Sequence, residues 1–112
     1  MKFKIKYYRI EEIEEEIEED SIVESQIVNN FRERHGDFVA IKEIKYIPPE
    51  GAELKEFYCL WLDMFENWKS KVVKAHDEIE IKFNLPEAKN FDFYCCLNNP
   101  KAKESLYRSV WD

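Results

Sequence analysis

The chain has 112 residues, of which 45% are hydrophobic and 37% are charged, and its formal net charge is −7. This composition is typical of a globular protein and argues against disorder outside the termini. No 18 apolar residues run together, and the first residues lack the apolar core of a signal peptide, so neither a membrane span nor secretion is expected. The length predicts a single domain over residues 1–112.

The charges are distributed unevenly along the chain. Residues 1–9 carry four bases and no acid, whereas residues 10–24 carry nine acids and no base. More than the whole net charge therefore lies in one short segment. Such local asymmetry points to a charged partner more strongly than overall acidity does.

The first third of the chain predicts one strand followed by helix. Alternating basic and apolar residues predict a strand over 2–9. Over 10–20, isoleucines three and four residues apart with glutamates between them predict an acidic amphipathic helix. A capping-box pattern then predicts a kink or a restart of the helix over 21–35, where basic residues and a following glycine indicate its end.

The middle of the chain predicts three strands and a helix. Residues 38–47 form a strand whose apolar face switches, which suggests a bulge or an edge position. Residues 56–63 are apolar or aromatic between their acidic ends, which predicts a central strand buried on both faces. A helix is expected over 65–76, with a hairpin as the alternative, and a strict alternation predicts a strand over 78–85.

The last part predicts a strand over 91–97 and a final helix. Asn99 is expected to cap that helix, with Pro100 at its first position. The fold class is therefore α+β, a ferredoxin-like βαββαβ core with a C-terminal β-α extension. In that order the strand at 56–63 falls in the middle of the sheet, beside the first strand. The sequence shows no internal repeat.

The acidic segment is the first candidate site. It is either a solvated face or a surface that meets a basic protein or a nucleic-acid-binding groove. The second interpretation predicts a small, non-enzymatic binding protein, with imitation of nucleic acid by an inhibitor as its narrower form. The expected partner-binding residues are Glu11, Glu12, Glu14, Glu15, Glu16, Glu18, Glu19 and Asp20.

A sheet face is the alternative candidate site. Aromatic and basic side chains on adjacent central strands are where readers of RNA and single-stranded DNA stack bases, and a small ligand is also compatible. The negative net charge and the absence of glycine from the central strand argue against this alternative. The residues concerned are Lys4, Lys6, Tyr8, Phe57, Tyr58 and Trp61. Either the C-terminal strand and helix or a second subunit must cover this face, and we favour a homodimer.

Little in the sequence predicts catalysis or a cofactor. Two glycines cannot build a phosphate-binding loop, and His35 and His76 are both expected at helix ends. Cys95 and Cys96 are adjacent, so in a strand they point to opposite faces and do not suit a shared metal ion. We expect three free thiols, no metal and no cofactor, in a cytoplasmic protein.

Overall fold

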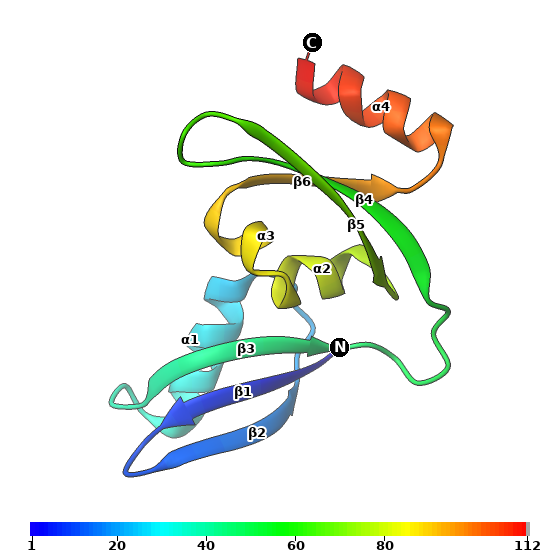
Figure 1. Ribbon diagram of the computed structural model, residues 1–112. Helices are drawn as coiled ribbons and strands as arrows, with labels where there is room; N and C mark the ends of the chain where they lie inside the picture. Colours follow the sequence, from blue (N-terminus) through cyan, green and yellow to red (C-terminus); the bar gives the residue numbers. More distant parts are fainter. Residues whose placement is uncertain (112) are drawn as a thin grey trace. The chain divides into compact units, whose positions relative to one another are not determined.

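The computed structural model describes residues 1–111, which contain four helices and six strands. The α+β class is confirmed. The chain divides into two compact units, Met1–Glu50 and Gly51–Asp112, each with its own three-stranded antiparallel sheet (Figure 1).

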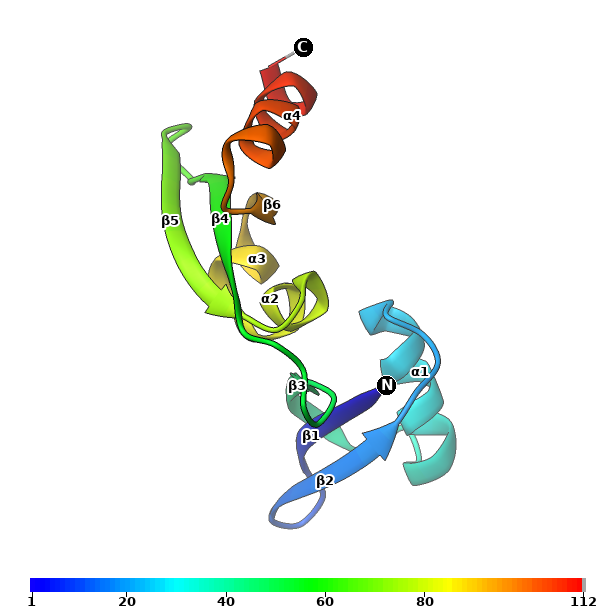
Figure 2. The same cartoon turned by 90° about the vertical axis from the view of Figure 1, so that its right-hand side faces the viewer.

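The first unit is a sheet covered on one face by a helix. Its strands pair in the order β2-β1-β3, and α1 lies along one face (Figures 1 and 2). The opposite face, which no element of this unit covers, is called the outer face below. The elements are β1 (Lys2–Tyr8), β2 (Glu12–Glu18), α1 (Glu24–His35) and β3 (Ala40–Ile47).

The core of the first unit follows from the two-residue period of β1. Phe3 and Ile5 are fully buried on the side of α1, where Ile27 and Phe31 are fully buried as well. Tyr7 continues the row, and its ring meets that of Phe31 edge to face with centroids 4.9 Å apart. Burying these side chains stabilises the unit by roughly 1.5–3 kcal/mol for each one. The predicted first strand is confirmed.

The helix predicted over 10–20 is wrong, because Glu12–Glu18 forms strand β2. Ile13 and Ile17 are four residues apart, and an even separation also places two side chains on one face of a strand. In a helix, glutamates four residues apart would repel one another, each pair costing about 0.2–0.5 kcal/mol. In the observed hairpin the outward glutamates lie across from the lysines of β1, which offsets that repulsion.

The rest of the first unit is close to the prediction. Helix α1 begins at Glu24 and not at Ser21, whose hydroxyl oxygen instead accepts a hydrogen bond from the Val23 amide. Its end is as predicted: Gly36 has a φ of 91°, and its amide donates to the Arg32 carbonyl. Strand β3 is an edge strand, as its switched apolar face indicates. Its pairing with β1 shifts in register between Lys6 and Tyr7 of β1.

The second unit has helices on both faces of its sheet. Its strands pair in the order β5-β4-β6, so the predicted central strand is confirmed as β4. The elements are β4 (Lys55–Leu62), β5 (Trp68–Ala75), α2 (Glu78–Asn84), α3 (Pro86–Asn90), β6 (Asp92–Leu97) and α4 (Pro100–Trp111).

Both faces of β4 are covered, as its continuous apolar run predicts. On one face Phe57 and Cys59 pack with Ile81 of α2. On the other face the hydroxyl groups of Tyr58 and Tyr107 lie 2.7 Å apart, which brings α4 against the sheet. The C-terminal helix therefore lies against part of this face, while Val72 and Tyr94 on the same face stay exposed. The homodimer stays a prediction.

The helix predicted over 65–76 is wrong, and the alternative hairpin is observed. A carboxylate oxygen of Asp63 accepts hydrogen bonds from the amides of Phe65 and Asn67, which closes the turn between β4 and β5. Glu66 has a φ of 61°, a left-handed conformation that a helix cannot accommodate. The turn lies at residues 63–67, a few residues before residues 67–70, where the sequence places the turn of the alternative hairpin.

The strand predicted over 78–85 is also wrong, because this segment contains α2. The Asp77 carboxylate accepts a hydrogen bond from the Glu80 amide and so caps the helix. Ile81 and Leu85, four residues apart, both belong to the hydrophobic core of this unit. The strand and final helix that follow are confirmed, with the Asn99 side chain accepting from the Ala102 amide at 2.8 Å.

The ferredoxin-like order is not confirmed, since the first predicted helix is a strand and the strands form two sheets. Each unit instead follows the same path: a hairpin, one or two helices, and a third strand that pairs with the first strand of its unit. The topology therefore repeats although the sequence does not. Whether 1–112 behaves as a single domain stays a prediction.

Candidate functional site

The acidic segment forms a regular row along β2. Glu12, Glu14, Glu16 and Glu18 point to the outer face, whereas Glu15 lies on the side of α1. Across from the outward four, β1 presents a tyrosine and three lysines. The row is therefore flanked on one side by cations. Its other side is the edge of the sheet, where β2 pairs with no strand among residues 1–111.

Two members of the predicted site are used within the first unit. Glu19 is buried, and its carboxylate accepts hydrogen bonds from Arg34 at 2.9 Å and from Asn30 at 3.1 Å. Glu15 lies 3.0 Å from Nε2 of His35. Both contacts join the β2 region to α1, so these carboxylates have a structural role.

Two further members are paired on the outer face. Lys42 Nζ donates to the Glu12 carboxylate at 2.8 Å, and this bond lowers the pKa of Glu12 and raises the pKa of Lys42. Lys4 Nζ lies 4.0 Å from Glu14. These exposed pairs contribute little to stability. They do neutralise one end of the row.

The remaining acids of the segment are Glu11, Glu16, Glu18 and Asp20. All four are exposed, and none has a side-chain ion pair within the described part of the chain. Glu16 and Glu18 differ from the other two because they are held on a strand. The structure thus reduces the eight predicted residues to two ordered carboxylates that are open to a partner.

A cavity of about 530 Å³ lies beside these two carboxylates, entirely within the first unit. Most of its lining has no signal in the sequence, where Pro48, Pro49, Glu50 and Gly51 indicate only a turn before the strand at 56–63. No periodicity indicates that the end of β3 lies across the sheet from β2. The cavity is lined by Met1, Lys2, Glu16, Glu18, Tyr46, Ile47, Pro48, Pro49 and Glu50.

The residues of the alternative sheet-face site are not brought onto one sheet. Lys4, Lys6 and Tyr8 belong to β1, whereas the three aromatic residues belong to β4 in the other sheet. Phe57 is buried, so it presents no ring to a base. Tyr58 has Lys103 Nζ 4.6 Å from its ring centroid, and Trp61 stacks on Phe93.

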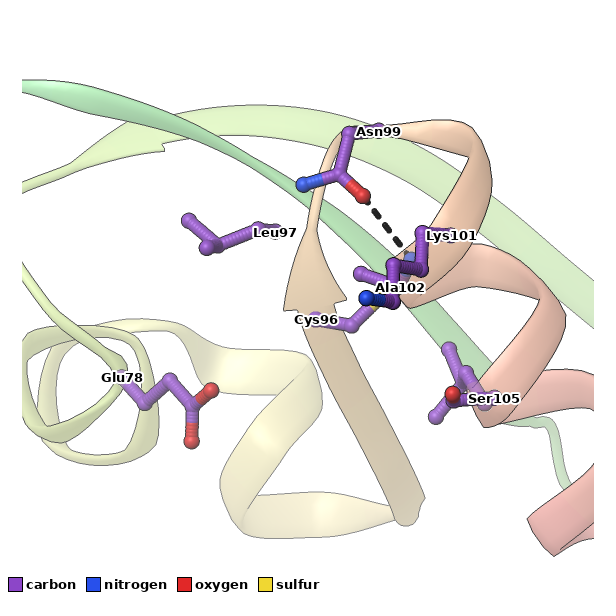
Figure 3. Close-up of a pocket in the computed structure, with 8 residues that line it drawn as sticks. Glu78, Cys96, Leu97, Asn99, Lys101, Ala102 and Ser105 are labelled. Atoms are coloured by element: carbon purple, nitrogen blue, oxygen red, sulfur yellow. Dashed lines mark hydrogen bonds between the residues drawn. The ribbon is translucent and has the colours of Figure 1, made fainter.

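A second cavity, of about 560 Å³, lies in the second unit between side chains of α2, β6 and α4 (Figure 3). Its chemically distinctive groups are the Cys96 thiol, the Glu78 carboxylate and the Lys101 amine. Burial raises the pKa of Cys96, which keeps the thiol protonated at neutral pH and makes it a poor nucleophile.

The other two thiols lie on paired strands of the second sheet, and both histidines contact carboxylates. Cys59 and Cys95 lie directly opposite each other on the neighbouring strands β4 and β6, and both are free thiols in this structure. Burial raises the pKa of Cys59 to about 11 and that of Cys95 to about 12. His76 contacts the Glu80 carboxylate at the start of α2. Residues 1–111 contain no group of three side chains suited to a metal ion.

Comparison with protein-family models, with curated proteins and with solved structures finds no match. Among the described residues, no helix is long and apolar enough to cross a membrane.

Proposed function

We propose that this protein is a non-enzymatic cytoplasmic binding protein whose acidic segment, residues 11–20, contacts a basic macromolecular partner. The observation that supports this proposal is the placement of Glu16 and Glu18. Both are exposed on the outer face of β2, and neither has an ion pair within residues 1–111. The partner is a basic protein that supplies the cations these carboxylates lack.

The form of the interaction follows from the strand geometry. Carboxylates on every second residue of a strand are about 6.8 Å apart. Glu12 and Glu14 are already paired with lysines, so the uncompensated part of the row is only two carboxylates long. The lysines of β1 also lie beside the row and reduce its negative potential. Short-range contacts with a few cations are therefore favoured. The narrower form of the proposal, in which the chain imitates nucleic acid at long range, is less favoured.

The proposal is tested by capture from a nuclease-treated lysate, with identification of the retained proteins. The test variant is Glu16→Gln with Glu18→Gln. The matched control is Glu33→Gln with Glu53→Gln, which removes the same charge from two exposed residues outside the segment. We expect a basic protein to be retained by the wild type and by the control, and to be lost from the test variant.

Two outcomes would contradict the proposal. Equal retention by the test variant and the control would show that the row is only a solvated face. Retention that is seen only in a parallel lysate without nuclease would show that the contact is not with a basic protein. If the retained protein also binds nucleic acid, competition between the two ligands decides whether this chain acts as an inhibitor.

A further inference from the structure

The cavity beside Glu16 and Glu18 combines two kinds of surface. Three carboxylates line it, from Glu16 and Glu18 on β2 and from Glu50 after β3. Its apolar side is formed by Ile47, at the end of β3, with the two prolines and the tyrosine beside it. The carboxylates are thus set beside an apolar wall, which an acidic patch on an open surface does not offer.

This combination matches one kind of side chain. Lysine and arginine carry a cation at the end of an aliphatic stem, and they bury the stem against apolar surface while the charged end meets an anion. Several carboxylates together can also accept from the several donors of a guanidinium group. A neutral side chain of the same length would leave the carboxylates without a partner, and an anion would be repelled.

The local lysine does not occupy this role. The register places Lys2 directly across from Glu18, yet Lys2 forms no ion pair in the part of the chain described here. The cavity therefore has three carboxylates against two cations, the Lys2 amine and the N-terminal ammonium group of Met1, and the latter donates to the Glu19 carbonyl. Its volume of about 530 Å³ leaves room for a long side chain together with part of the backbone that carries it.

We propose that this cavity binds a lysine or arginine side chain presented by the basic partner. The inference rests on the proposed function, because it names the group by which that partner is held. Glu16 and Glu18 bind the cationic end, and Ile47 with Pro48 and Pro49 contacts the stem. Glu50 closes the site from the segment that follows β3.

The test is a titration of the ¹⁵N-labelled full chain, followed by amide chemical shifts. The probes are the N-acetyl methylamides of arginine and lysine, with that of citrulline as a neutral match for arginine. For a single side chain we expect a dissociation constant on the order of 1 mM for at least one cationic probe. The saturable shifts should be confined to the amides of Lys2, Glu16, Glu18, Ile47 and Glu50.

Variants separate this site from general attraction to an acidic protein. Glu16→Gln with Glu18→Gln should weaken cationic-probe binding at least tenfold, while Glu33→Gln with Glu53→Gln should leave it unchanged. Citrulline should cause no saturable shift. Equal binding of citrulline, equal binding by both variants, or shifts spread over all acidic residues would each overturn the inference. Correctly folded variants are verified in the same spectra.

The outcome is distinguishable from that of the capture experiment. Probe binding without a captured basic protein would retain the side-chain site and refute the proposed partner. A captured protein whose retention needs Glu16 and Glu18, together with no binding of either cationic probe, would retain the proposed function and refute the side-chain site.

Discussion

At the scale of single residues, the acidic segment contains carboxylates with different roles. Glu19 is buried and bonded to Arg34 and Asn30, whereas Glu16 is exposed and has no ion pair in the described part of the chain. The sequence treats both as members of one run. Only the position of α1 distinguishes them, because it brings donors to one carboxylate and not to the other.

This difference predicts that the same substitution changes the free energy of unfolding by unequal amounts at the two positions. Glu19→Ala leaves the donors of Asn30 and Arg34 without their acceptor and should lower the free energy of unfolding by about 1–3 kcal/mol. Glu16→Ala should change it by no more than about 0.5 kcal/mol. Urea unfolding followed by circular dichroism measures both values. Equal losses would contradict the structural role assigned to Glu19.

The thiols give a second prediction at this scale. The pKa of Cys59 is raised to about 11 from an ordinary value of 9.0 because the side chain is buried. At pH 8 its thiolate fraction is then about 100-fold below that of an ordinary thiol, and access is blocked as well. Cys59 should therefore react with a thiol reagent at least 100-fold more slowly in the native chain than in urea, as measured by mass spectrometry of the labelled peptide. Comparable rates would contradict its burial.

At the scale of elements, the sequence predicts what depends on local chemistry and misses what depends on pairing. The continuous apolar run of β4, the glycine at the end of α1 and the Asn99 cap of α4 each contain their own signal, and each is confirmed. Strand β2 contains a spacing that fits both a helix and a strand. The choice between helix and strand depends on the lysines of β1 across the hairpin. The residues of β2 alone contain no information about this pairing.

The same limit explains the cavity. Glu16 and Glu18 could be found from the acidic run, but Ile47, Pro48 and Glu50 join them only because β3 pairs with the other edge of β1. In α2 the sequence predicts a strand where the chain forms a helix, because the strict alternation of apolar residues is a stronger strand signal than the single capping residue Asp77 is a helix signal. Short segments with both signals are decided by tertiary packing.

The hydrogen bond that joins α3 to β5 should make the free energy of unfolding depend on pH. Lys71 Nζ donates to the Glu87 carboxylate at 2.8 Å, and this bond lowers the pKa of Glu87 below its usual range. A carboxyl whose pKa is lowered by folding stabilises the native state above its unfolded pKa, and that stabilisation is lost as the pH falls through the folded value.

Glu87→Gln should therefore reduce the free energy of unfolding at pH 7 and should have a smaller effect at each step towards pH 3. Urea unfolding of both proteins across this range measures the difference. Because the pair is partly exposed, the loss at pH 7 should stay below about 1 kcal/mol. A difference that grows as the pH falls would contradict the assignment.

At the scale of the whole molecule, the two units can be followed separately. All three tryptophans lie in the second unit, since residues 1–50 contain none. Tryptophan fluorescence therefore reports the unfolding of the second unit, whereas circular dichroism reports both. The single-domain prediction requires the two signals to change together. Separate midpoints in urea would show that the units unfold independently.

The charge of the molecule also differs between its units. Residues 1–50 carry 13 acids and 8 bases, and residues 51–112 carry 11 acids and 9 bases. Most of the net negative charge therefore belongs to the unit that contains β2. A basic partner should be attracted mainly to this unit, and the attraction should weaken as salt is added.

The most direct test of the account is the affinity of the full chain for the captured basic partner at 150 mM salt, measured by isothermal titration calorimetry. The account predicts that Glu16→Gln with Glu18→Gln weakens binding at least tenfold, which corresponds to about 1.4 kcal/mol. Glu33→Gln with Glu53→Gln should bind as the wild type does. Equal dissociation constants for the wild type and both variants would contradict the claim that the row on β2 contacts the partner.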